Sequence, residues 1–219
     1  ASLSVADGEF VAIVGPTGGG KTTLTSLLLR MYEPTRGTIE VDDIDIQTLP
    51  RAFLRRHIGY VPQDVLIFKG TVLDNILMGR DGLTADDAMA AARAIGADEW
   101  IERLPGSYRH PLSERGANLS TGERQMLAFT RALVGRPSVL ILDEATSSVD
   151  SETEHRIQRA IDVLLRGRTA LVVAHRLSTV RRANMIAVMH HGQIREIGSH
   201  AGLMAQDGLY RRYQQLQLD

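Results

Sequence analysis

The hydrophobic positions of this chain gather into short uninterrupted runs that end at glycine or polar residues. Runs of this length favour strands that are buried on both faces, because a strand exposed on one face alternates apolar and polar residues. Fully buried strands are typical of parallel sheets covered by helices. Runs of this kind occupy residues 10–14, 58–61, 139–142, 168–174 and 185–189.

Helical and short extended segments separate these runs. Turn residues at 34–37 precede two short predicted strands, so we expect a small antiparallel portion near the N-terminus. Two further strands are expected about a turn at His190–Gly192. The shorter strands are predicted at 38–41, 43–46 and 193–197, and helices at 21–31, 49–56, 152–165, 199–206 and 208–217.

Residues 71–135 differ from the rest, because helical patterns dominate and no strand is expected among them. We interpret this segment as a helical subdomain inserted into an α/β core that is formed by residues 1–70 and 136–219. The expected helices of this subdomain cover residues 72–78, 85–95, 97–104 and 122–134.

A glycine-rich turn directly follows the first apolar run and precedes a helix. Its spacing fits the pattern G-x-x-x-x-G-K-[ST], which is known as the Walker A motif or phosphate loop. Glycines allow backbone N–H groups to surround an anion, and the helix N-terminus adds unpaired donors. The predicted phosphate-binding residues are Gly15, Pro16, Thr17, Gly18, Gly19, Gly20, Lys21, Thr22 and Thr23.

This motif predicts a nucleotide phosphate group and Mg²⁺ as ligands and an α/β P-loop NTPase (RecA-like) core with a mostly parallel sheet. Lys21 is expected to reach the β- and γ-phosphates, and the Thr22 hydroxyl to bind Mg²⁺.

Polar side chains follow three other predicted strands, at the ends where ligands of open α/β sheets gather. Asp143 ends the run 139–142 and suits water-mediated Mg²⁺ binding. Glu144 is placed to reach a water in line with the γ-phosphate. Gln63 could hold Mg²⁺ or the attacking water, and His175 could contact phosphate.

Ser120 and Glu123 have the spacing of a capping box at the start of the helix 122–134. This pattern alone predicts an ordinary helix start, although Gly122 would also allow a phosphate to approach the helix N-terminus. Asp150 is predicted to end a turn that begins at Ser147 and to cap the helix 152–165.

Composition narrows the function further. The 219 residues carry a net charge of −1, which argues against bulk electrostatic binding to nucleic acid. The chain has no cysteine, which excludes disulfides, thiol catalysis and cysteine zinc sites. No apolar stretch approaches the roughly 18–20 residues of a membrane-spanning helix.

The order of the motifs along the chain resembles that of an ABC ATPase. These motifs are the phosphate loop, Gln63, residues 119–125, Asp143-Glu144, residues 147–150 and His175. The chain is identified as similar to the nucleotide-binding domain of an ABC transporter over almost its whole length. Residues 68–76 and 113–116 resemble the exporter type, at positions that would face the coupling helices of a transmembrane domain.

The resemblance implies a head-to-tail dimer, with an identical or a different second ATPase domain, around two MgATP. Thr22, Gln63 and Asp143 would surround Mg²⁺, Glu144 would polarise the attacking water, and His175 would contact the γ-phosphate. The partner's ATP would meet Ser120 and Gly122, and the Asp150 loop would line the interface. The domain would act at the cytoplasmic face of a membrane.

Two departures from the family pattern bear on activity. The family signature L-S-G-G-Q has Thr121 in place of its first glycine and Glu123 in place of glutamine. Both changes could weaken one composite site, as in one half of a heterodimeric exporter. The aromatic residue that stacks on adenine in this family is expected upstream of residue 1. Phe10 belongs to a core strand and is not expected to replace it. We therefore predict weaker nucleotide binding by residues 1–219.

The sequence also bears on three alternative functions. A GTP-binding switch would need an N/T-K-x-D motif, which the chain lacks. A non-transport ABC ATPase of DNA repair or translation would carry coiled-coil insertions or tandem domains. A nucleotide-binding regulatory module with little turnover stays open because of the altered signature.

Overall fold

The computed structural model describes residues 1–144 and 150–216. The chain forms two compact units, each described by itself below. The first unit comprises Ala1–Ile58, Val139–Thr146 and Arg168–Asp219, and the second comprises Gly59–Ser138 and Ser147–Gly167.

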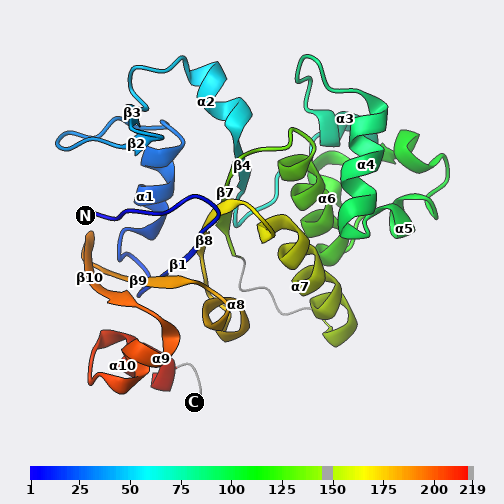
Figure 1. The fold of residues 1–219 in the computed structure, drawn as a ribbon. Helices are drawn as coiled ribbons and strands as arrows, with labels where there is room; N and C mark the ends of the chain where they lie inside the picture. The colour runs from blue at the N-terminus through cyan, green and yellow to red at the C-terminus, as the bar shows by residue number, and fades with distance from the viewer. Residues whose placement is uncertain (145–149, 217–219) are drawn as a thin grey trace. The chain divides into compact units, whose positions relative to one another are not determined.

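The first unit contains a mostly parallel sheet, as the apolar runs predict. Strand β1 lies between β8 and β9 and is parallel to both, while β7 is parallel to β8. Strand β10 pairs antiparallel with β9, so the neighbours run in the order β10-β9-β1-β8-β7 (Figure 1). The strands are β1 (Phe10–Val14), β7 (Val139–Asp143), β8 (Thr169–Val173), β9 (Met185–His190) and β10 (Gln193–Gly198).

Burial explains why these strands read as continuous apolar runs. All residues of β1 are buried, and Val11, Ile13, Leu171 and Met189 share one core cluster. Strand β10 instead alternates exposed and partly buried residues, since it has a neighbour only in β9 within the described sheet of this unit.

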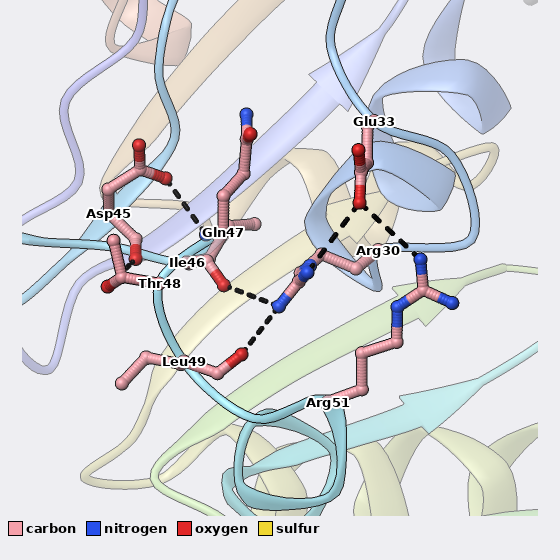
Figure 2. Close-up of polar contacts among 8 residues, drawn as sticks. All are labelled: Arg30, Glu33, Asp45, Ile46, Gln47, Thr48, Leu49 and Arg51. Atoms are coloured by element: carbon pink, nitrogen blue, oxygen red, sulfur yellow. Dashed lines mark hydrogen bonds and ion pairs between the residues drawn. The ribbon is translucent and has the colours of Figure 1, made fainter.

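Helix α1 (Lys21–Leu28) ends earlier than the predicted limit at Met31. Arg30 has a φ of +48° and leaves the helix, and its side chain turns to another segment. Its Nη1 donates to the carbonyl of Ile46 at 2.9 Å and to that of Leu49 at 2.6 Å, as Figure 2 shows. A tertiary contact therefore sets the end of this helix.

The predicted antiparallel portion near the N-terminus is present, although its strands are shorter than expected. Strands β2 (Glu40–Val41) and β3 (Ile44–Asp45) pair across a turn at Asp42 and Asp43, which both have positive φ. Helix α2 (Arg51–His57) follows.

Three short helices complete the first unit. Helix α8 (Leu177–Arg181) follows β8, and α9 (His200–Ala205) and α10 (Leu209–Leu216) follow β10. Tyr210 is fully buried, and its hydroxyl is 2.6 Å from Nδ1 of His200, which joins α9 to α10.

The second unit is built around α6 (Thr121–Leu133), most of whose residues are buried. Helices α3 (Val72–Leu77), α4 (Ala85–Ile95) and α7 (Ser151–Leu165) pack against α6, and α5 (Asp98–Ile101) packs on α4 (Figure 1). Capping boxes at Thr71, Thr84 and Ser120 begin α3, α4 and α6.

The expectation that residues 71–135 contain no strand is wrong. Besides β4 (Ile58–Val61), this unit holds β5 (Gly70–Thr71) and β6 (Pro111–Leu112), which pair antiparallel. Two residues per strand are too few to produce a visible alternation, so tertiary pairing alone defines them. Single 3-10 turns lie at Ser107–Arg109 and Glu114–Gly116.

Helix length also bears on membrane topology. Over the residues described, the structure contains no helix that combines the length and the apolarity needed to cross a bilayer.

Candidate functional site

The predicted catalytic residues of the first unit meet at one edge of its sheet. In the pairing register, Ile13 lies beside Val173, and Val173 lies beside Asp143. Because the three strands are parallel, the segments that follow them leave the sheet at the same edge. The phosphate loop, Glu144 and His175 follow directly, so the structure brings these predicted site residues together.

The phosphate loop has the backbone that its glycines predict. Gly15, Gly18 and Gly20 have φ values of +146°, +76° and +100°, which other residues rarely adopt. A Cβ on Gly15 would collide with the carbonyl oxygen of Met189. The amide of Gly192 donates to the carbonyl of Gly19 at 2.9 Å. The β9–β10 hairpin therefore supports the loop, a role that the sequence did not indicate.

Lys21 lies folded into this loop. Its ammonium donates to the carbonyls of Gly15 at 2.8 Å and Pro16 at 3.0 Å, and the residue is only 7% exposed. Burial lowers the pKa of Lys21, and the charge of Asp143 acts in the opposite direction. An ammonium has three N–H donors, so one remains beyond these two bonds for an anion.

The first turn of α1 also suits an anion. Gly20 occupies the N-cap position, so the N-cap residue has no side chain to cap the turn that follows. The backbone N–H groups there have no partner within the helix. Thr22 and Thr23 are exposed in the same turn, so the Thr22 hydroxyl is accessible.

Asp143 at the end of β7 and His175 just after β8 both interact electrostatically with Lys21. Asp143 is buried, and its charge influences both Lys21 and His175. Burial and the charge of Lys21 lower the pKa of His175, although Asp143 and Glu144 oppose this shift. The net shift favours the neutral imidazole of His175 over its charged form.

Glu144 is 5% exposed and is fixed by residues that the sequence analysis did not single out. Its Oε2 accepts hydrogen bonds from the amides of His175 at 3.0 Å and Arg176 at 3.1 Å. Its Oε1 accepts from the hydroxyl of Thr179 at 2.8 Å and lies 3.8 Å from Nε of Arg176. No pattern in the sequence indicated these contacts, because Thr179 is 35 positions away.

The remaining predicted site residues lie in the second unit. Gln63 is exposed after β4, and Ser120 is the exposed N-cap of α6. Asp150 caps α7 by accepting from the amide of Thr153 at 2.9 Å. Since this unit is described by itself, the approach of these residues to the phosphate loop stays a prediction. The predicted turn residues 147–149 lie outside the described residues.

Gly122 has a packing role that the sequence did not reveal. A Cβ at this position would collide with Cγ2 of Thr153 on α7. The predicted capping box is present, since the Ser120 amide donates to Glu123 at 2.8 Å and Ser120 Oγ accepts from the Glu123 amide at 3.2 Å.

The exporter-like segment 68–76 is held by contacts that the sequence also did not reveal. The amide nitrogen of the Asn75 side chain donates to the carbonyls of Phe68 at 2.8 Å and Thr71 at 3.0 Å. Nε of Arg131 on α6 donates to the backbone carbonyl of Asn75 at 2.8 Å. Asn75 is 56 positions away, so no local pattern predicts the bond.

Comparison with known proteins agrees with this geometry. A family model described as ABC transporter matches residues 1–147. The chain is 47% identical over 209 residues to the uncharacterized ABC transporter ATP-binding protein YknV of Bacillus subtilis, covering 95% of the chain and 35% of YknV. It is 48% identical over 216 residues to the cyclolysin secretion/processing ATP-binding protein CyaB of Bordetella pertussis, covering 99% of the chain and 30% of CyaB.

A solved structure, of a bacterial Atm1-family ABC exporter with ATP bound, matches with a TM-score of 0.90 and 41% identity. The match covers 98% of this chain and 38% of that one. The chain thus spans about a third of the length of the relatives it matches. The sequence motifs, the sheet topology and these matches agree that the chain belongs to the ABC transporter family, as its ATP-binding domain, the part that hydrolyses ATP.

Proposed function

We propose that this domain powers an ABC exporter by binding and hydrolysing MgATP as a head-to-tail dimer. The observation that carries the proposal is the meeting of Lys21, Asp143, Glu144 and His175 at one edge of the sheet, beside an anion-binding loop. These groups could act together on the terminal phosphate of ATP.

The residues present fit both nucleotide and metal. A Cβ at Gly19 would lie only 2.9 Å from the Pro16 carbonyl oxygen, so this tight turn of the phosphate loop requires glycine. The Thr22 hydroxyl and the Asp143 carboxylate are hard oxygen donors of the kind that hold Mg²⁺ beside phosphate oxygens, with Gln63 as a third candidate. When bound, Mg²⁺ would neutralise developing charge on the phosphates.

Each residue of the chain has a distinct proposed task. The phosphate loop and Lys21 bind and orient the phosphates. Glu144 polarises the attacking water as a general base, and His175 contacts the γ-phosphate. Ser120, Gly122 and the Asp150 loop belong to the interface with the second ATPase domain.

The coupling to export is supported by relatives and by sequence. The compared proteins include a cyclolysin secretion protein and an Atm1-family exporter. We therefore propose a transmembrane domain as partner, contacted through residues 68–76 and 113–116, and a position at the cytoplasmic side of a membrane. The segment 71–135 would be the helical subdomain that carries the signature, and 1–70 with 136–219 the core.

The rate of ATP hydrolysis at increasing protein concentration tests this proposal. With Mg²⁺ and saturating ATP, the rate per molecule should rise with concentration, because a complete site needs two domains. Chelation of Mg²⁺ and the Lys21→Ala variant should each abolish hydrolysis. A flat rate near zero with ATP still bound would instead support the regulatory module with little turnover, which the altered signature at Thr121 and Glu123 favours.

A further inference from the structure

The proposed base Glu144 faces protein rather than solvent. It is 5% exposed, although it directly follows Asp143, the last residue of β7, at the carboxyl end of the sheet. A carboxylate that polarises water must present an oxygen to that water. The described orientation of Glu144 is therefore a resting one, and something must hold it there.

Three hydrogen-bond donors hold it, and the guanidinium of Arg176 lies 3.8 Å from its Oε1. The amides of His175 and Arg176 bind Oε2, and the hydroxyl of Thr179 binds Oε1 at 2.8 Å. The two amides belong to the backbone that leaves β8, so their positions are set by the sheet. Thr179 is therefore the side chain whose hydroxyl anchors Oε1 directly.

Thr179 is well suited to this task. It is 2% exposed, so water does not compete for its hydroxyl. Threonine has few side-chain rotamers, and α8 holds its backbone. A hydrogen bond to a charged group inside a protein contributes more than one between neutral groups.

We propose that Thr179 is a positioning residue for Glu144, whose hydroxyl holds the carboxylate in the resting orientation until nucleotide binding releases it. The inference rests on the proposed role of Glu144 as the base. Only the released carboxylate can reach the attacking water, so the hydrolysis rate depends on its population.

Thr179→Val tests this inference, because valine keeps the shape and removes the donor. We expect kcat for ATP hydrolysis to rise roughly tenfold, because loss of one hydrogen bond to a charged group shifts the population away from the resting orientation by about that factor. The KM for ATP should stay unchanged. Thr179→Ser keeps the hydroxyl and should restore the original kcat. Thr130→Val removes another buried hydroxyl, bound to the Met126 carbonyl of its own helix, and should leave kcat unchanged.

An unchanged or lower kcat in folded Thr179→Val overturns the inference. Thr179→Ala provides a second variant without the hydroxyl, and failure of both to fold would show that Thr179 is structural. Either result leaves the proposed function intact.

Amide hydrogen exchange separates the two proposals. Release of Glu144 should speed exchange at His175 and Arg176 in Thr179→Val, because their acceptor has left. If Glu144→Gln hydrolyses ATP as fast as the original chain, the base assignment fails. Unchanged exchange in Thr179→Val shows that Thr179 does not hold Glu144, whatever Glu144 does.

Discussion

Asp74 illustrates how single residues of this chain satisfy backbone groups at helix starts. Its Oδ2 accepts from the Thr71 amide at 2.8 Å, and its own amide donates to Thr71 Oγ1 at 3.0 Å. Hydrogen bonding of this carboxylate to the Thr71 backbone first, and to the Thr71 side chain second, lowers the pKa of Asp74 below its ordinary value of 3.8. The ionised form is thus favoured in the folded state.

A lowered pKa makes stability depend on pH in a known direction. The contribution of Asp74 is complete above pH 3.8, its unfolded value, and is lost as the pH falls through the lower folded value. In Asp74→Asn, whose amide can still accept the bond but does not titrate, the free energy of unfolding should fall less steeply in this acidic range. Urea unfolding at a series of pH values measures this, and an identical pH dependence would contradict the assignment.

At the same scale, Lys21, Glu144 and His175 were predicted from their places in the chain, whereas Thr179 was not. The sequence alone shows whether a residue follows a predicted strand or lies in a glycine-rich loop, because both are local properties of the chain. The partner of a carboxylate depends on how two strands are aligned, and that alignment is tertiary.

At the scale of elements, α6 shows what patterns predict well. Its capping box predicted where the helix begins, and the structure shows that most of its residues are buried. Its neighbour α7 was also expected, at 152–165 against Ser151–Leu165 in the structure. The close approach of Gly122 to Thr153 was not predicted, because a contact between two helices leaves no periodic pattern in the sequence.

This contact predicts that a methyl group added at Gly122 will destabilise the fold. Gly122→Ala places a Cβ against Thr153 Cγ2, and the two helices must separate. We expect a loss of about 1–3 kcal/mol in the free energy of unfolding, measured with urea. Gly135→Ala is the matched control, because its Cβ would meet Arg80 at an ordinary 3.5 Å.

The same variant separates packing from nucleotide contact. If Gly122→Ala keeps its stability and loses hydrolysis, the close approach to the partner's ATP is the dominant role of this glycine. If both are unchanged, neither role holds.

At the scale of the whole molecule, the proposed cycle joins two domains through ATP and separates them after hydrolysis. Glu144 enters this cycle at hydrolysis and not at binding, because Lys21 and the loop amides provide the contacts to phosphate. A variant without the base should therefore stop after association.

Glu144→Gln should keep ATP binding, lose hydrolysis by at least about a hundredfold, and accumulate as a dimer with MgATP. Size-exclusion chromatography with light scattering, with and without ATP, measures this. Lys21→Ala is the control and should stay monomeric under both conditions. Loss of ATP binding in Glu144→Gln would show that this residue does not act as the base, and a monomer with ATP bound would support an unlike partner domain.

By itself, the sequence determined the α/β class, the parallel strands, the phosphate loop and the polar residues that follow the strands. These features depend on the spacing of apolar residues, on the conformational freedom of glycine and on short separations along the chain, all of which are local.

Tertiary structure alone decided the rest. It set the end of α1 through Arg30, formed the β5–β6 pair, placed the β9–β10 hairpin under the phosphate loop, and turned Glu144 toward Thr179. Each of these joins groups that are distant in sequence, and their hydrogen bonds form only once the strands and helices have packed.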